Sequence, residues 1–122
     1  MGKTPEERAS TRMWTRRVDL QIIEPLTTGF RYSEGLELFK SRMQTIPEAA
    51  EGLKSIAQEK LAWLNGEMDG KDYICGDRFS LADIMLFCFI AFGATVGQNL
   101  SEENTNITSW YDRVKERSSA TA

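Results

Sequence analysis

An uncharged run in the second half of the chain limits what it can fold into. From Ile84 to Gly97 the sequence carries no charged residue. The run is too short and too rich in glycine for a membrane span, which needs about 20 apolar residues. The other structure that such a run can form is a helix buried inside a domain. The first turn of that helix must still satisfy its free N–H groups. Ser80 and Asp83 have the spacing of a capping box, and a carboxylate is favoured at this end of the helix dipole.

The residues on either side of this cap are apolar. Phe79 and Ile84 lie at the two positions of a hydrophobic staple. We therefore interpret this group as a structural start signal for a core helix: Phe79, Ser80, Asp83 and Ile84. Asp83 as a catalytic acid is the alternative, and we favour the capping role because it already explains both polar residues.

Composition excludes several classes of function. A chain of 122 residues has the length of one domain, and its net charge of −3 argues against nucleic acid as a partner. Histidine is absent, which removes the commonest general base and metal ligand, and we expect no metal site. No apolar segment near the N-terminus predicts a signal peptide. The two cysteines, Cys75 and Cys88, make no disulfide framework, so we expect reduced thiols in a cytoplasmic protein.

Helix signals recur along the whole chain. Thr4 and Pro5 start a first helix that we expect to run to about Glu24, where Pro25 ends or kinks it. Asn106 is the expected N-cap of the last helix. The other predicted segments are a short helical piece over residues 35–42 and helices over 47–68, 81–95 and 107–117.

The sequence shows no period-two alternation of strand length. We therefore expect an all-α helical bundle of four main helices plus short helical pieces. The bundle should cover residues 1–117, with a disordered tail over 118–122.

A row of arginines on the first helix is the strongest candidate for a binding surface. Arg8, Arg12 and Arg16 are spaced four apart, with Arg17 beside them, and like charges at this spacing repel each other. Within the helix only Asp19 is placed to offset Arg16. One interpretation is a solvated basic face. The other is a face that meets anionic groups outside the domain, because arginine forks suit carboxylates.

Four segments together resemble the C-terminal domain of the glutathione S-transferase family. "YICGDRFSLADI", residues 73–84, resembles the segment that leads into the core helix of that domain. "NITSWYDRVKER", residues 106–117, resembles its last helix, although Thr105 and Ser118 stand where the family often has proline. "PEERASTRMWTRRVDL" and "PEAAEGLKSIAQEKLAWLNGEM" resemble its first helix and the helix before the capping segment, in the right order.

The resemblance implies that a partner domain is missing. In the family an N-terminal thioredoxin-like domain binds glutathione and activates its thiol, and the helical domain supplies much of the pocket for an apolar electrophile. The resemblance implies that the parent is a dimeric transferase with glutathione as co-substrate and no tightly bound cofactor. This chain alone is expected to be inactive.

Site residues are implied by their position on the first helix. The expected wall of the electrophile pocket consists of Met13, Trp14, Arg17, Val18 and Gln21. Arg12 and Arg16 are expected on the side of glutathione or of the neighbouring subunit. No catalytic residue is expected within the chain. The alternative is a non-catalytic interaction module, like the helical domains of translation elongation and aminoacyl-tRNA synthetase complexes.

Overall fold

The computed structural model describes residues 2–121 and contains no strand among them. The elements are α1 (Pro5–Val18), a π-helical segment (Asp19–Ile23), α2 (Glu24–Arg31), α3 (Leu36–Phe39), a 3-10 turn (Pro47–Ala49), α4 (Ala50–Glu67), α5 (Leu81–Thr95), α6 (Thr105–Lys115) and a last 3-10 turn (Ser118–Thr121). The all-α prediction is therefore confirmed.

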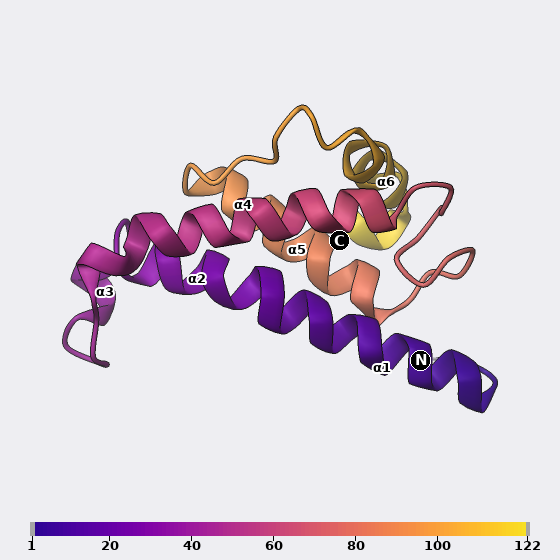
Figure 1. Ribbon diagram of the computed structural model, residues 1–122, viewed down its shortest axis with the longest axis horizontal. Coiled ribbons are helices and arrows are strands. Elements are labelled where there is room, and N and C mark those ends of the chain that lie inside the picture. Colours follow the sequence, from indigo (N-terminus) through magenta and orange to yellow (C-terminus); the bar gives the residue numbers. More distant parts are fainter. Residues whose placement is uncertain (1, 122) are drawn as a thin grey trace.

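The uncharged helix of the sequence, α5, contributes to a core that it shares with the other long helices. The line α1–α2 runs the length of the molecule, and α4 returns beside it in the opposite direction (Figure 1). Helix α5 packs on α1, while α6 lies across the end of α4 and is seen nearly end-on in Figure 1. The core combines residues of every long helix: Trp14, Val18, Ile22, Leu61, Leu64, Leu86, Ile90, Ile107, Trp110 and Val114.

The sequence predicts that Pro25 ends or kinks the first helix at about Glu24, and in the structure the helical line continues past this point after an interruption. A π-helical segment follows α1, and the N–H of Glu24 donates to the carbonyl of Asp19 one residue further back than in an α-helix. Proline lacks the N–H that the α-helical ladder needs, and both prolines and π-bulges are recognised causes of kinks in helices. Pro25 then lies in the first turn of α2, where proline is tolerated, so the helical line continues to Arg31.

The N-terminal start follows the sequence signals. The backbone N–H of Glu7 donates to Thr4 Oγ1 at 3.1 Å, and Pro5 is the first residue of α1. The N–H of Lys3 donates to Glu7 Oε2 at 2.6 Å, and this bond holds the pKa of Glu7 below its usual value.

The start of α6 differs from the prediction. The helix begins at Thr105 after Asn104, and Asn106 lies inside the first turn. The side chain of Asn106 instead donates to the carbonyl of Asn65 at 2.8 Å, and Asn65 Oδ1 accepts the N–H of Ile107 at 3.0 Å. A residue of α4 therefore supplies the cap that the sequence assigned to Asn106. The helix also ends at Lys115, two residues before the predicted end.

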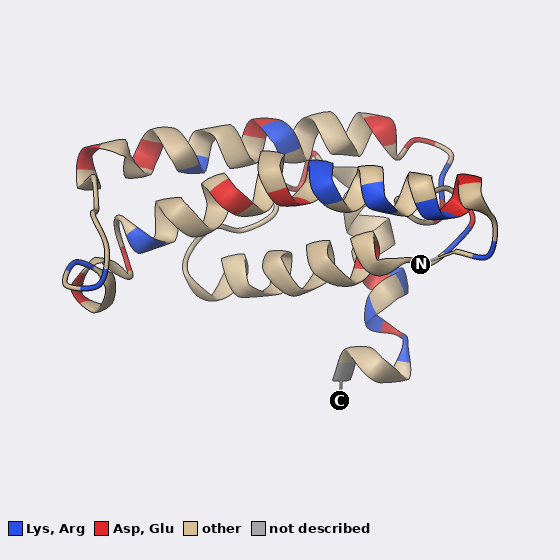
Figure 2. Ribbon diagram, turned by 90° about the horizontal axis from the view of Figure 1, so that it is seen from below, with Lys and Arg blue, Asp and Glu red and all other residues tan. Residues whose placement is uncertain are grey.

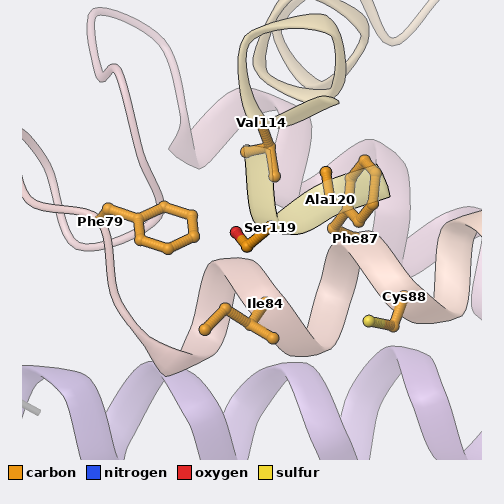
Figure 3. A pocket seen from close by; sticks show the side chains of 7 residues that line it. All are labelled: Phe79, Ile84, Phe87, Cys88, Val114, Ser119 and Ala120. Carbon is orange, nitrogen blue, oxygen red and sulfur yellow. The ribbon is translucent and has the colours of Figure 1, made fainter. Parts of the chain in front are cut away.

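The end of the described chain is a 3-10 turn, Ser118–Thr121, where the sequence predicted a tail without structure. Ser119 and Ala120 face Phe79 and α5, as Figure 3 shows. The guanidinium of Arg117, just before the turn, lies 3.7 Å from the ring centroid of Phe79. Residue 122 of the predicted tail lies outside the described residues.

Candidate functional site

The side chain of Asp83 lies at the start of α5 and has no exposed surface. Its Oδ2 accepts the backbone N–H of Ser80 at 2.9 Å and lies 3.3 Å from Ser80 Oγ. Its Oδ1 accepts the N–H of Ile74 at 3.0 Å and Nε1–H of Trp110 at 2.7 Å. Both oxygens are thus occupied by donors from three separate segments, which leaves none directed at a cavity.

This geometry bears on the two roles that the sequence left open for Asp83. A buried carboxylate is tolerated when several donors satisfy it, and a general acid or base needs room beside the proton that it transfers. Asp83 has the hydrogen-bond donors that a buried carboxylate needs, and it lacks the space that a general acid or base needs. Sequence reasoning found the bond to Ser80 but missed Ile74 and Trp110, because neither lies at a local helical spacing from Asp83.

Phe79 and Ile84 border a hollow of about 290 Å³ between α5 and the C-terminal turn. Its remaining lining residues are Phe87, Cys88, Val114, Ser119 and Ala120 (Figure 3). The ring of Phe79 lies edge-on to Tyr73, with centroids 5.6 Å apart. Ile84 is 46% exposed, so its burial against Phe79 as a staple stays a prediction.

The five residues expected to form one pocket wall lie at different depths in the structure. Trp14 and Val18 are buried in the core, where Trp14 lies against Trp63 of α4 with ring centroids 6.1 Å apart. The Arg17 guanidinium stacks over the outside of this pair, 5.4 Å from the Trp14 ring centroid. The other two members of the expected wall, Met13 and Gln21, are exposed and half-buried, respectively.

A hollow of about 310 Å³ does open on α1, but on its side toward α5. Its lining residues are Arg12, Thr15, Arg16, Asp19, Leu81 and Met85. Arg16 pairs with Asp19 at 3.5 Å. Arg12 makes no ion pair or side-chain hydrogen bond with any residue that the structure describes. The arginines were expected at a binding face, whereas no binding role was expected for the other lining residues, Thr15, Asp19, Leu81 and Met85.

Helix α5 also turns an uncharged side to the solvent. Leu81 is 41% exposed, Ile84 46%, and Cys88 belongs to the same exposed side. In Figure 2 the ribbon of α5 carries one acidic band near its beginning and is otherwise without charge, whereas α1 shows basic bands turn after turn. A helix that is apolar all round is normally buried on all sides.

A metal-binding cluster and a membrane-spanning helix are both absent from residues 2–121. No cluster of His, Cys, Asp and Glu side chains in this part of the chain could hold a metal ion. Nor does any helix in it have the length and hydropathy to cross a membrane.

The fold and the sequence together define the class of this protein. The family described as "Glutathione S-transferase, C-terminal domain" matches residues 31–118, and the chain belongs to that family. The resemblance noted from the four sequence segments is therefore confirmed.

Individual relatives include two proteins of different kinds. Glutathione S-transferase 2 of Saccharomyces cerevisiae is 27% identical over 123 residues, covering 97% of this chain and 51% of that protein. Elongation factor 1-gamma of Danio rerio is 26% identical over 112 residues, covering 90% of this chain and 24% of that protein.

Among solved structures, that of Gtt2 from Saccharomyces cerevisiae superposes with a TM-score of 0.89 and 26% identity, over 98% of this chain and 58% of that one. The chain therefore spans about half the length of the transferases it matches, and a quarter of the elongation factor.

Proposed function

We propose that this chain is the C-terminal, electrophile-binding half of a glutathione transferase. The observation that carries the proposal is the uncharged exposed side of α5, formed by Leu81, Ile84 and Cys88, in a chain half as long as its transferase relatives. Such a side needs a covering surface. A thioredoxin-like N-terminal domain that precedes this sequence in the whole protein is the proposed cover.

In this proposal the chemistry is divided between the two halves. The N-terminal half binds glutathione and lowers the pKa of its thiol. The thiolate sulfur then attacks the electrophile and forms a carbon–sulfur bond, while the electrophile either takes up a proton or expels a leaving group. The helical half holds the electrophile and excludes water, which raises the effective concentration of the reacting groups. It contributes no catalytic residue of its own.

The binding residues are proposed from the first helix. Met13, Arg17 and Gln21 would face the electrophile, with Trp14 and Val18 supporting them from the core. Arg12 and Arg16 would face glutathione carboxylates or the neighbouring subunit of a homodimer. We place the whole protein in the cytoplasm as a detoxifying enzyme, in keeping with the two free cysteines among the described residues of this chain.

The first experiment compares glutathione conjugation by the isolated chain and by its natural full-length protein, with chlorodinitrobenzene as electrophile. We expect turnover only by the longer protein. Saturable turnover by the isolated chain would contradict the division of chemistry, and inactivity of both would favour a binding module.

A matched pair of variants tests the covering surface. Ile84→Glu in the full-length protein should place a charge under the covering domain, and conjugation should fall by about tenfold or more. Leu38→Glu changes a residue that is 54% exposed at the opposite end of the molecule and should leave conjugation unchanged. Equal activity of both variants would indicate that no other domain covers the exposed side of α5.

A non-catalytic interaction module is the second candidate. The match to elongation factor 1-gamma covers 90% of this chain at an identity close to that of the transferase. A module of this kind would bind a partner protein and would show no glutathione-dependent reaction. The comparison of turnover described above separates the two candidates.

A further inference from the structure

The guanidinium of Arg78 attaches the loop before α5 to the first turns of α1. Its Nη2 donates to the carbonyl oxygen of Glu7 at 2.9 Å and to Thr11 Oγ1, also at 2.9 Å. Arg78 is half-buried and stands two residues before Ser80, the N-cap of α5. The two bonds therefore connect the beginning of α5 with α1, and the two helices lie side by side in Figure 1.

Thr11 is the buried acceptor of this contact. It has no exposed surface, and its hydroxyl donates to the carbonyl oxygen of Glu7 at 3.0 Å. Because the hydroxyl proton is used in that bond, the oxygen is left to accept from Arg78. Hydrogen bonds from a charged donor are stronger than neutral ones, and a buried acceptor that loses its donor is costly. Arg78 therefore helps to determine where the second turn of α1 lies.

The hydrogen bonds of Asp83 do not provide this attachment. They join the start of α5 to Ser80 and Ile74 in the preceding loop and to Trp110 of α6, and none of them reaches α1. Arg78 extends the same group of connected segments to α1. This is the helix on which the binding residues were proposed above.

We propose that Arg78 is a positioning residue for the electrophile site and acts on that site through α1. Met13 follows Thr11 by two residues and Arg17 lies about one turn further on, so a shift of the second turn moves both side chains. A displacement of about 1 Å in a reacting site can reduce a rate by a large factor. The inference rests on the proposed function, since the conjugation reaction gives these side chains their substrate.

The two substrates should respond differently to the loss of Arg78. In the proposed function glutathione is bound by the N-terminal half, whereas the electrophile lies against α1. A less firmly held α1 should therefore lower kcat/KM for the electrophile and leave the KM for glutathione nearly unchanged. A purely structural role would reduce the amount of folded enzyme, which lowers the measured kcat with both substrates and changes neither KM.

The first test is Arg78→Met in the full-length protein, because methionine keeps an aliphatic stem and removes the donor. We expect kcat/KM for chlorodinitrobenzene to fall about tenfold and the KM for glutathione to stay within about twofold of wild type. Arg78→Lys is the conservative variant: both bonds come from one nitrogen, and an ammonium group has three donors. Its kcat/KM should stay within about threefold of wild type. Equal losses in the two variants would overturn the proposal.

Arg113→Met is the matched control. The guanidinium of Arg113 donates to the carbonyl oxygen of Asp72 at 2.9 and 3.2 Å and so attaches the same loop to α6 instead of α1. Its kcat/KM for the electrophile should stay within about twofold of wild type. An equal fall in Arg113→Met and Arg78→Met would mean that any loosening of the loop lowers activity, which would contradict a specific role of Arg78.

Amide hydrogen exchange of the same proteins gives a readout that needs no activity. Exchange over residues 8–14 should be about tenfold faster in Arg78→Met and unchanged in Arg113→Met. Wild-type exchange there in Arg78→Met would overturn the attachment of α1.

The kinetic outcomes separate this inference from the proposed function. A full-length wild-type protein without conjugation activity would contradict the proposed function and the role of Arg78 in it. An active wild type, with an unchanged kcat/KM in Arg78→Met, would contradict the inference about Arg78 alone.

Discussion

Nε1–H of Trp110 donates to Asp83 Oδ1 at 2.7 Å and thereby joins the inner side of α6 to the first turn of α5. The same oxygen accepts the N–H of Ile74, so the loop before α5 is attached at the same point. A residue that the sequence marks as a helix cap therefore also connects three segments of the fold. This arrangement stabilises the fold, and it orients α5 relative to the elements that border the two hollows.

Removal of the Asp83 carboxylate should cost more than the loss of a cap. Asp83→Ala leaves the buried N–H groups of Ile74, Ser80 and Trp110 without an acceptor, and we expect a loss of roughly 3–5 kcal/mol in unfolding free energy. Urea denaturation followed by circular dichroism measures it. Asp77→Ala, an exposed carboxylate in the same loop, is the control and should stay within about 0.5 kcal/mol of wild type. A loss of only about 1 kcal/mol in Asp83→Ala would mean that Asp83 acts only as a local helix cap.

The bridge to α6 is tested separately by Trp110→Phe. The ring remains apolar while the N–H donor is lost, so Asp83 keeps its bonds to the α5 start and loses the one to α6. We expect a loss of about 2–3 kcal/mol, part of it from the smaller ring. In a double-mutant cycle with Asp83→Ala the two losses should be clearly less than additive. Additive losses would mean that the two side chains do not act together.

Two glycines of the long helices should respond in opposite directions to alanine. A Cβ at Gly93 in α5 would lie 2.9 Å from the carbonyl oxygen of Gln98, a backbone atom that cannot turn away. We expect Gly93→Ala to destabilise the protein by about 1–2 kcal/mol. Gly52→Ala in α4 meets nothing within 4 Å and should stabilise it by about 0.5–1 kcal/mol. Thermal melting of both variants checks the contrast, and two shifts of the same sign would refute it.

Acid should weaken the attachment of Glu34 to α4. Burial acts to raise the pKa of Glu34, but hydrogen bonds from Lys54 Nζ, at 2.8 Å, and from Ser33 outweigh it and lower the pKa below its usual value. A lowered pKa means that the ionised group stabilises the fold above its unfolded pKa and that this contribution disappears as the pH falls through the folded pKa.

Glu34→Gln should therefore lose less stability than wild type when the pH is lowered below about 5. Denaturation curves over this range give the comparison. In a Lys54→Met background, which keeps the aliphatic stem, the same substitution should change the slope less. Identical slopes for wild type and Glu34→Gln would show that the lysine contact does not affect the titration.

Local signals predicted the elements well. The limits of α5, Leu81–Thr95, agree with the prediction from Ser80, Asp83 and the uncharged run, because caps and periodicity act within one or two turns. The start of α1 at Pro5 follows from Thr4 and Pro5 for the same reason.

What the sequence did not predict depends on contacts between distant segments. Asn65 replaces Asn106 as the cap at the start of α6 because α4 lies beside that position. After the π-helical segment, the helical line continues beyond Pro25. Trp14 was expected in a pocket wall because of its position on the first helix. It lies in the core because Trp63 of α4 packs against it. Periodicity gives the faces of a helix but not which neighbour each face meets.

The most direct test of the central claim is the intact mass of the endogenous protein, measured after isolation from its native cells. The proposal that this chain is half of a glutathione transferase predicts a mass of about twice 13.8 kDa, with thioredoxin-like sequence preceding residue 1. A mass close to 13.8 kDa would contradict it and would leave the helical domain acting alone.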